Sequence, residues 1–556
     1  MRLPLLSFLC GFVLATAGAA DTRPNILWIV SDDQGYGDLS AMGHPVLKTP
    51  HLDRLKSESV WLKNFYVAPL CAPTRAALLT GRHNFRTGIW DTWASRSNLA
   101  ADEVTIADHL RRGGYTTAQI GKWHLGENYP ARPIDRGFEH AFVWNNLDRF
   151  APTFARDGQT TAPYPGFLDN VVTDEAIRFL GRKHERPFFA YVPLYLPHTF
   201  WAKQVPDEDV RRFADVPDLS PSDREVMGML ENLDRNVGRL LAALRALGLE
   251  ENTLVIFHSD NGLGGRRQSA SLFNAGLRGA KGQVLEGGIR VPCFVRWTGR
   301  LAPRVETARA AGVDLLPTLL EATGLPPSSR KLDGISLWPL LRGDLKALSD
   351  RFIVQQQQPQ KSGLPPQPFV NATIIGPRYK LLWLQDEATP ELYDLEADEG
   401  EKTNLALRMP ERVAEMKAAY RKWFDVAAAE RGFAPVPPTV GHPAQPVFRE
   451  SMIQVPEKTG IPLVVARAGE YRIRLGHVQA ALFPAGGWLG LTDGTHIWKG
   501  KVDAGTAEVV LNVPLPAGRV TLRPWAEGRT EKLGYVPVGL DPGCRDLTIE
   551  LIRVSP

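Results

Sequence analysis

The chain has 556 residues, which is too long for a single hydrophobic core and predicts two or three domains. Its composition, with 44% hydrophobic and 23% charged residues, is that of a folded globular protein and excludes long-range disorder. The net charge of +4 is close to zero, which argues neither for nor against a nucleic-acid partner, and any preference for anions must come from local side chains. We expect no nucleic-acid partner.

Residues 1–20 predict a signal peptide. An apolar run from Leu3 to Ala15 is followed by small residues before Asp21, as at a cleavage site, and the run is too short to span a bilayer stably. We therefore expect an exported protein, periplasmic or secreted, without a stable membrane anchor. The cysteines that would remain after cleavage are an odd, sparse set and not a disulfide framework: Cys71, Cys293 and Cys544.

From Pro24 to about Trp338, apolar runs alternate with helical patterns, which predicts an α/β fold with helices on both faces of a mostly parallel sheet. The predicted strands are Ile26–Val30, Thr116–Ile120, Phe188–Val192, Leu254–Phe257 and Ile289–Phe294. The predicted helices are Pro50–Ser57, Thr105–Arg112, Asp174–Leu180, Arg224–Leu247 and Asp314–Glu321.

The rest of the chain predicts smaller units. A strand is expected at Tyr379–Leu384 and an amphipathic helix at Met409–Phe424, and short alternating segments beyond a proline-rich stretch predict an all-β module. The expected organisation is a signal peptide at 1–20, a main domain at 21–345, a C-terminal subdomain at 346–434, a linker at 435–446 and a β-rich accessory module at 447–556.

Acidic pairs follow two of the predicted strands. Asp32 and Asp33 come after Ile26–Val30, and Asp260 and Asn261 come after Leu254–Phe257. Ligands of open α/β sheets bind beyond the carboxyl ends of the strands, so both pairs should lie at one edge. A single pair would more often be a turn or a helix cap. Two pairs of oxygen ligands without a thiolate or histidine cluster predict a Ca²⁺ or Mg²⁺ site.

Cys71 stands two residues before Pro73 and a helix-forming run, and it is therefore expected at a helix N-terminus, where free N–H groups attract anions. Further polar side chains follow other strands or lie in a glycine-rich loop, and each alone is more often structural. Their common position at one sheet edge makes them candidates for a site: Arg75, Lys122, His124, His198 and Lys281.

The run Cys-Ala-Pro-Thr-Arg at 71–75, with the segments 121–126 and 259–262, resembles the signature of type I sulfatases, arylsulfatase-like members of the alkaline phosphatase superfamily. The resemblance extends from Pro24 to about Leu405. It implies an alkaline-phosphatase-like catalytic domain and a small α+β C-terminal subdomain, to which the alternating segments beyond the linker add the all-β module. The chain departs from the commoner pattern at Thr74, where serine is usual, and at Phe200, where proline is frequent.

The resemblance implies a sulfuric ester hydrolase that acts on sulfate monoesters. A formylglycine-generating enzyme would oxidise Cys71 to formylglycine, whose hydrate carries two hydroxyl groups on one carbon. One hydroxyl would attack sulfur and give a covalent sulfated intermediate, and the other, deprotonated through His124, would collapse and expel sulfate. Asp32, Asp33, Asp260, Asn261 and residue 71 would hold the cation. Lys122, His198 and Lys281 would bind the substrate, with His198 and Lys281 protonating the leaving oxygen and Arg75 holding residue 71.

Two other functions remain open at this point. A phosphomonoester or phosphodiester hydrolase could use the same metal edge, although the cysteine favours sulfate. A catalytically silent glycan-binding protein would result if Cys71 stayed a thiol. Trp488, Trp498 and Trp525 could then stack on sugar rings, although tryptophan in a β-module is more often part of the core.

Substrate choice is expected to depend on two loops, at 86–97 and at 145–170, because loops at strand ends carry specificity. Their aromatic and arginine side chains suit a sulfated sugar. We therefore expect a sulfated small molecule or glycan as the partner, with a carbohydrate favoured.

Overall fold

The computed structural model of the chain describes residues 23–92, 96–145, 148–199, 205–264, 273–344, 350–358, 365–434, 436–445, 447–453, 461–476, 487–503, 508–527 and 547–553. The predicted signal peptide, Phe200 and Cys544 lie outside these residues. Within them, no helix is both long enough and apolar enough to cross a membrane.

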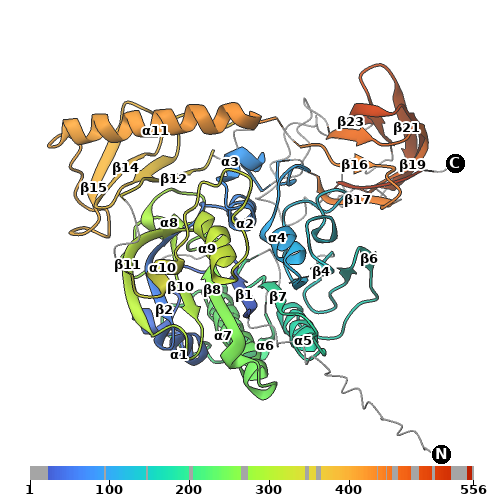
Figure 1. Cartoon of the computed structure of the whole chain (residues 1–556). Helices are drawn as coiled ribbons and strands as arrows, with labels where there is room; N and C mark the ends of the chain where they lie inside the picture. Colours follow the sequence, from blue (N-terminus) through green and yellow to red (C-terminus); the bar gives the residue numbers. More distant parts are fainter. Residues whose placement is uncertain are drawn as a thin grey trace, which may run out of the picture.

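The centre of the molecule is an eleven-stranded sheet, and β1 (Asn25–Ser31) lies in its middle, between β8 (Thr253–Ser259) and β7 (Phe188–Pro193) (Figure 1). β1 pairs in parallel with both neighbours, and all its residues are buried. The order along the sheet is β11-β2-β10-β8-β1-β7-β3-β4-β5-β6, with β9 on β2. The remaining strands are β2 (Val60–Tyr66), β3 (Thr116–Ile120), β4 (His140–Trp144), β5 (Phe154–Arg156), β6 (Gln159–Thr160), β9 (Arg290–Val291), β10 (Cys293–Arg296) and β11 (Arg304–Ala311).

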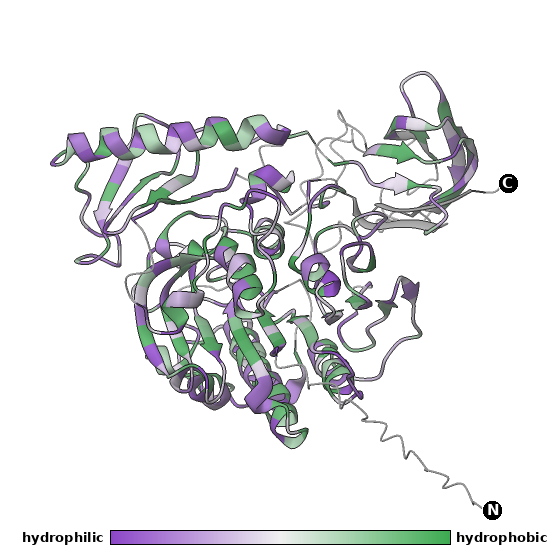
Figure 2. Cartoon of the chain, viewed as in Figure 1, coloured by the Kyte–Doolittle hydropathy of each residue, from purple (hydrophilic) through white to green (hydrophobic). Residues whose placement is uncertain are grey.

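Helices cover both faces of this sheet and enclose two apolar cores. Leu27 and Ile29 face the core under α1, α5 and α7, whereas Trp28 and Val30 face the core under α2, α4, α9 and α10. In Figure 2 the central strands are mostly green, as expected for strands covered on both faces. The helices of this part are α1 (Pro50–Ser57), α2 (Cys71–Thr80), α3 (Asn84–Thr87), α4 (Ile106–Arg112), α5 (Leu168–Leu180), α6 (Asp207–Arg211), α7 (Pro221–Ala246), α8 (Glu286–Ile289), α9 (Leu315–Ala322) and α10 (Trp338–Leu341).

The predicted α/β architecture is confirmed, and β3 and α1 have the predicted bounds. One predicted strand, Ile289–Phe294, is wrong as a single parallel element. Helix α8 ends at Ile289, two short strands follow, and β10 runs antiparallel to β8. Helix α5 begins at Leu168 rather than at Asp174. Strands β2 and β11 were not predicted, because each mixes buried with half-exposed or exposed positions and lacks a continuous apolar run.

A second, four-stranded antiparallel sheet carries the long helix α11 (Pro410–Arg431) on one face, and Figure 1 shows both above the large sheet. Tyr420 and Phe424 of α11 pack against Trp383 and against Phe85 of α3, so this core is shared with the main domain. The strands are β12 (Ile353–Gln356), β13 (Ala372–Ile375), β14 (Tyr379–Trp383) and β15 (Pro390–Asp394).

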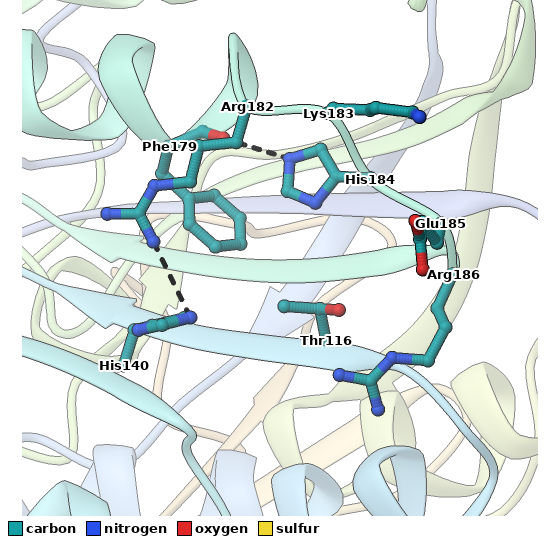
Figure 3. Close-up of a pocket in the computed structure, with 8 residues that line it drawn as sticks. All are labelled: Thr116, His140, Phe179, Arg182, Lys183, His184, Glu185 and Arg186. Atoms are coloured by element: carbon teal, nitrogen blue, oxygen red, sulfur yellow. Dashed lines mark hydrogen bonds between the residues drawn. The ribbon is translucent and has the colours of Figure 1, made fainter.

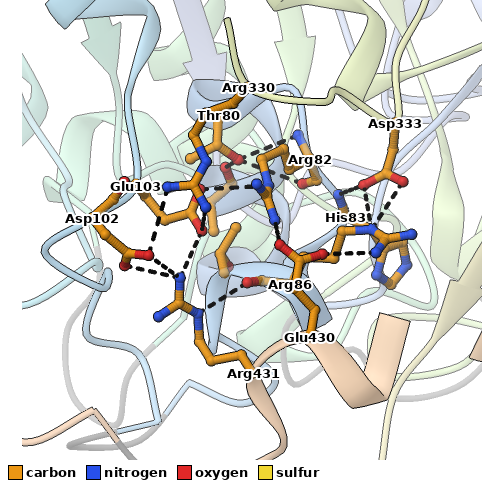
Figure 4. Close-up of polar contacts among 12 residues, drawn as sticks. Thr80, Arg82, His83, Arg86, Asp102, Glu103, Arg330, Asp333, Glu430 and Arg431 are labelled. Atoms are coloured by element: carbon orange, nitrogen blue, oxygen red, sulfur yellow. Dashed lines mark hydrogen bonds and ion pairs between the residues drawn. The ribbon is translucent and has the colours of Figure 1, made fainter. Parts of the chain in front are cut away.

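The C-terminal end of α11 is joined to the main domain by a network of ion pairs (Figure 4). Glu430 accepts hydrogen bonds from Arg82 and, at 2.8 Å, from Arg86. Arg431 donates to Asp102 at 2.9 Å and to Glu103 at 3.0 Å. The side chain of Glu103 is fully buried, so removing its arginine partners would leave a bare charge inside the protein. These ion pairs fix α11 against the segment that follows α2.

Two mostly antiparallel sheets make up the C-terminal region, with one parallel pair, β16 and β18 (Figure 1). Their orders are β16-β18-β23-β20-β21 and β17-β24-β19-β22, and their inner faces enclose a third apolar core. This agrees with the predicted all-β character. The strands are β16 (Thr439–Val440), β17 (Val447–Ile453), β18 (Ile461–Val465), β19 (Gly469–Gly476), β20 (Gly487–Thr492), β21 (Ile497–Val502), β22 (Glu508–Leu515), β23 (Gly518–Glu527) and β24 (Leu547–Arg553).

An open pocket of about 270 Å³ lies at the amino ends of β3, β4 and β7 (Figure 3). This is the edge of the large sheet opposite to the one where the acidic pairs emerge. Arg182 donates weakly to His140 across it, at 3.5 Å. The pocket therefore lies at the other edge of the sheet from the candidate active site described below. The pocket is lined by Thr116, His140, Phe179, Arg182, Lys183, His184, Glu185 and Arg186.

Two buried histidines of the main domain are held in the neutral form. Nε2 of His258 accepts a hydrogen bond from the indole of Trp28 at 2.8 Å, so its Nδ1 donates to the carbonyl of Ser259 at 2.8 Å. Burial lowers the pKa of His258 to about 4. Burial also lowers the pKa of His83 to about 4, although Asp333 acts in the opposite direction.

We expect the protein to lose stability in acid because of these two side chains. An unfolded histidine titrates near pH 6.5, so between about pH 6.5 and 4 the unfolded state binds more protons than the native state. For each histidine, the free energy of unfolding should fall by about 3 kcal/mol between pH 7.5 and pH 4. Denaturant unfolding of the wild type and of His258→Gln measures this. The free energy of unfolding of the variant should be smaller at pH 7.5 but should fall less on acidification to pH 4. An equal fall in both proteins would contradict the expectation.

Candidate active site

The two acidic pairs meet at the carboxyl edge of the large sheet, as predicted. Ser31 and Ser259 are partners in the parallel pairing of β1 with β8, so the residues after them lie side by side. The Asp33 amide donates to Oδ1 of Asp260 at 3.2 Å, and Nδ2 of Asn261 donates to Oδ1 of Asp33 at 2.9 Å. All four side chains, including that of Asp32, are buried. Asp33 is in the left-handed region, with φ of 71°, which is strained for a non-glycine residue and typical of functional sites.

Cys71 is the first residue of α2, and Leu70 is the N-cap. The predicted helix start is therefore correct, with Pro73 as the third helical residue instead of the first. A sulfur or oxygen ligand atom from each of Cys71, Asp32 and Asp33 lies within 4.8 Å of the others. The hydroxyl of Thr74 donates to the carbonyl of Ala68 at 3.0 Å, so it ties the preceding turn to the helix.

Arg75 lies one turn further along α2 and is fully buried. Its Nε and Nη2 donate to Oδ2 of Asp260 at 3.1 and 2.7 Å, and its Nη1 donates to the carbonyl of Lys122 at 3.2 Å. Arg75 therefore connects the helix of Cys71 with the ends of β8 and β3. A charged pair that is both buried and hydrogen-bonded at several atoms fixes geometry, because breaking it would leave a bare charge inside the protein.

Lys122 and His124 follow β3. The ammonium group of Lys122 donates to Oδ2 of Asp32. Nε2 of His124 lies 3.0 Å from the carbonyl of Thr92, which can only accept, so Nε2 carries the proton. Nδ1 of His124 is buried without a hydrogen-bond partner and is therefore available as an acceptor. At Gly121, with φ of 126°, any side chain would meet the carbonyl of Pro193 at 2.0 Å, so only glycine allows β3 and β7 to end so close together.

His198 and Lys281 reach the site from two other segments. Nζ of Lys281 donates to Oδ1 of Asp33 at 2.5 Å, and Nε2 of His198 lies 3.9 Å from Oδ2 of the same carboxylate. The amide of Gly282 donates to the carbonyl of Pro69 at 2.9 Å, which attaches the lysine loop to the turn before Cys71. The structure thus brings together every predicted candidate residue, from six segments of the chain.

Three carboxylates and three cationic side chains balance one another in this site. Burial is the largest single influence on the pKa of Asp32 and would raise it, but Lys122 and the other neighbouring cations together outweigh burial, and the pKa lies well below its usual range. Likewise, burial would raise the pKa of Asp33, but Lys281 and its neighbours together lower it. Burial lowers the pKa of His124 and of His198 to about 3, with Lys122 and Lys281 respectively adding to the effect. Both imidazoles are therefore neutral near pH 7.

The donor set fits a hard divalent cation. Oδ1 of Asp32 and Oδ1 of Asn261 are both buried and have no hydrogen-bond partner, although buried polar atoms are normally paired. Carboxylate and amide oxygens of this kind are ligands that Ca²⁺ and Mg²⁺ prefer. The charges of the three carboxylates and the three cationic side chains already cancel. A divalent cation would therefore leave the site positively charged and suited to an anionic substrate.

Two supporting residues were not predicted individually, although both lie in the stretch 145–170. Arg149 donates from Nη2 to the carbonyl of His198 at 2.7 Å. Oδ1 of Asp169, the second residue of α5, accepts from the amides of Tyr195 and Leu196, at 2.8 and 3.3 Å. Together they hold both ends of the turn that presents His198. A single polar residue in a loop or at the start of a helix carries no periodic or motif signal, so the sequence could not identify them.

We expect Arg149→Met to lower kcat by about 10- to 100-fold, because the turn of His198 would lose its fixed position. Arg156→Met is the matched control, since Arg156 also pairs with an acidic residue of α5, Glu175, but does not touch the turn. Steady-state kinetics and thermal unfolding of both variants measure the effect. A similar fall in kcat for the two variants would contradict a role specific to His198.

The other predicted loop, 86–97, also reaches the site, and its residues 93–95 lie outside the described part of the chain. Besides the contact of Thr92 with His124, the loop carries a buried carboxyl, Asp91, whose pKa burial raises to about 6. Nη1 of Arg96 lies 3.5 Å from Asp91, and its guanidinium lies 4.7 Å from the ring centroid of Trp90. The loop therefore brings the pair of Asp91 and Arg96 close to His124, whereas the ring of Trp90 is buried in the core shared with α11.

Comparison with known proteins identifies the family. The family model described as Sulfatase matches residues 24–325, which is more than half of the chain. The chain belongs to the sulfatase family. The matched region contains every residue of the site described above, and the segments at 71–75, 121–126 and 259–262 are the ones on which the resemblance was based.

Relatives of known activity support the same assignment. Human arylsulfatase A is 37% identical over 368 residues, which cover 60% of this chain and 70% of that protein. N-acetylgalactosamine-6-sulfatase of Canis lupus familiaris is 34% identical over 392 residues, which cover 63% of this chain and 71% of that protein. The solved structure of Ps i-CgsB in complex with k-i-k-neocarrahexaose has a TM-score of 0.67 and 26% identity and covers 74% of this chain and 95% of that one.

The protein is thus an enzyme, a sulfuric ester hydrolase with the fold of the alkaline phosphatase superfamily. The formylglycine mechanism is general for this family, and the family implies a divalent metal in the site. The prediction of a sulfatase is confirmed, and the phosphoester hydrolase and the silent glycan-binding protein are not needed to explain the chain.

Proposed function

We propose that this sulfatase removes sulfate from a sulfated carbohydrate, with residue 71 converted from cysteine to formylglycine as its nucleophile. The observation that carries the proposal is the position of Cys71. It is buried at the first turn of α2, within ligand distance of Asp32 and Asp33. A hydrated aldehyde at this position supplies one hydroxyl to take up the sulfate group and a second whose deprotonation releases it.

We propose Ca²⁺ as the cation, with Mg²⁺ as the alternative. Asp32, Asp33, Asp260 and Asn261 would hold it together with residue 71. The number of oxygen donors supports Ca²⁺, which takes six to eight ligands, over Mg²⁺, which keeps several waters. When bound, the cation would withdraw electron density from the sulfate oxygens and favour attack on sulfur.

The cationic side chains would bind the substrate. Lys122 and Lys281 donate to Asp32 and Asp33, two of the carboxylates that would hold the cation, so each could also contact a sulfate oxygen. Nδ1 of His124, free to accept, would take the proton from the hydrate of residue 71. His198 would donate to the leaving oxygen with Lys281. An anionic ester next to His198 favours its protonated form, which supports that step. Arg75 would hold α2 in place.

A carbohydrate substrate is supported by two observations. A relative is named for N-acetylgalactosamine 6-sulfate, and a structural neighbour was solved with a neocarrahexaose. We further propose that the protein is exported to the periplasm or the medium. A formylglycine-generating enzyme would convert Cys71.

A panel of defined sulfated monosaccharides tests the substrate class. We expect at least one of them to be hydrolysed with kcat/KM in the usual enzyme range, about 10⁴ M⁻¹s⁻¹ or higher. Aryl, steroid and phosphate esters are the comparison substrates. Turnover of a steroid sulfate well above that of every sulfated sugar would reject a carbohydrate, and faster turnover of phosphate esters would reject sulfate selectivity.

A further inference from the structure

The C-terminal β-sandwich presents one sheet face that differs from the rest of its surface. In the five-stranded sheet, Leu489, Leu491 and Leu522 point into the apolar core. Since side chains alternate along a strand, the residues between them lie on the outer face. This outer face is defined here by Trp488 of β20, Ile497, Lys499 and Lys501 of β21, and Arg519 and Arg523 of β23.

The tryptophans divide between the two faces. Trp498 packs against the apolar core, in agreement with the usual role of tryptophan in a β-module. Trp488 is 39% exposed, and Ile497 is 53% exposed on the neighbouring strand. The side chain of Trp525 is not among those that the structure describes. A single exposed aromatic ring is common on protein surfaces, so the significance of Trp488 depends on the charged side chains near it.

Two lysines lie on the β21 side of this ring. Nζ of Lys499 lies 4.9 Å from the ring centroid of Trp488, and Lys501 is the cross-strand partner of Trp488. Lys499 and Lys501 are both exposed, and Arg523 is half-buried on the next strand. The register places Glu527 opposite Trp488 on β23, so the positive charge is concentrated over β21 and the middle of β23.

We propose that this outer face binds a sulfated polysaccharide and so holds the enzyme on its polymeric substrate. The apolar face of a sugar ring would stack on Trp488, and sulfate groups along the chain would pair with Lys499, Lys501 and Arg523. The proposal rests on the carbohydrate substrate proposed above. Charge complementarity selects this occupant, because a neutral glycan would use the ring but gain nothing from the positive charge of the face.

The opposite sheet of the same sandwich provides an internal comparison. Its outer face also carries two exposed cations, Arg472 and Arg474 of β19, and an exposed apolar residue, Val510 of β22. It carries no aromatic side chain among the residues described there. If charge alone attracted the polymer, both faces would serve equally, whereas the proposed face combines charge with an aromatic ring.

Binding of a sulfated galactan by the full-length chain tests the proposal, with Cys71→Ala present so that the polymer is not consumed. Trp488→Ala should weaken binding by about tenfold or more. The double variant Lys499→Gln/Lys501→Gln should weaken it by about fivefold and reduce its salt dependence. The matched control, Arg472→Gln/Arg474→Gln, removes the same charge from the other sheet and should change binding by less than about twofold.

The same substitutions made with Cys71 intact should leave kcat/KM for a small sulfated sugar unchanged, since the face is outside the catalytic domain. Unchanged galactan binding in Trp488→Ala would overturn the proposal. So would an equal loss in the control variant, or equally tight binding of desulfated galactan or of single-stranded DNA. If small sulfated sugars are not hydrolysed but galactan binding depends on Trp488, the substrate proposal fails and the binding face stands.

Discussion

Replacing Cys71 with alanine should reduce kcat/KM for every sulfate ester by about 10⁴-fold or more, because no other side chain of the site can supply the nucleophile. The cation and the lysines would still bind the ester. KM should therefore change little, and the loss should fall on kcat. Cys71→Ser tests the modification itself, since a serine hydroxyl keeps an oxygen at this position but cannot form the hydrate.

The matched control for this prediction is Cys293→Ala. Cys293 is also buried in the main domain, on β10, but does not touch the site. It should lower stability slightly and leave kcat unchanged. Peptide mass spectrometry of the wild type gives the second readout, because conversion replaces the thiol-bearing CH₂SH by an aldehyde. A fully unmodified thiol in an active enzyme, or more than about 1% activity in Cys71→Ala, would contradict the mechanism.

Removal of the divalent cation should have the next largest effect, a loss of activity of about 10³-fold, because the cation stabilises charge in the transition state by several kcal/mol. Binding should also stabilise the fold, since only the native state brings the oxygens of Asp32, Asp33 and Asn261 together. We expect thermal unfolding of chelated protein to shift upward on addition of Ca²⁺, and less with Mg²⁺ at equal concentration.

Asp33→Asn should abolish this Ca²⁺-dependent stabilisation. Asp314→Asn is the matched control, because Asp314 is an equally buried carboxylate whose ion pair with Arg351 lies at the start of α9 instead of in the site. The control should be less stable but should keep its response to Ca²⁺. An equal response in Asp33→Asn, or a larger shift with Mg²⁺ than with Ca²⁺, would reject the proposed Ca²⁺ site.

The sequence predicted the central architecture well because its strongest signals come from burial. A fully buried strand such as β1 reads as a continuous apolar run, and the acidic residues that follow it mark its carboxyl end. β2 and β11 are partly exposed and gave no such run. The antiparallel direction of β10 was also hidden, because pairing direction depends on the whole sheet and not on the composition of one strand.

The candidate site was predicted residue by residue, but its electrostatic pairing was not. Sequence order cannot tell that Lys122 would reach Asp32 while Lys281 reaches Asp33, since these contacts join segments far apart in the chain. For the same reason the support of His198 by Arg149 and Asp169 could not be predicted. Such contacts follow from tertiary packing, because the arrangement of strands in the sheet determines which loops meet.

The burial of α2 determines whether Cys71 can be modified before or after the protein folds. All ten residues of the helix are buried, and Cys71 is only 2% exposed. A modifying enzyme must enclose its target residue in its own active site, which is impossible for a side chain enclosed in a finished core. Conversion of Cys71, as proposed, must therefore precede the packing of residues such as Asp260 and Gly282, which come much later in the chain. Chains that fold before they are modified would be stable, well-formed and permanently inactive, so the yield of working enzyme depends on timing during synthesis.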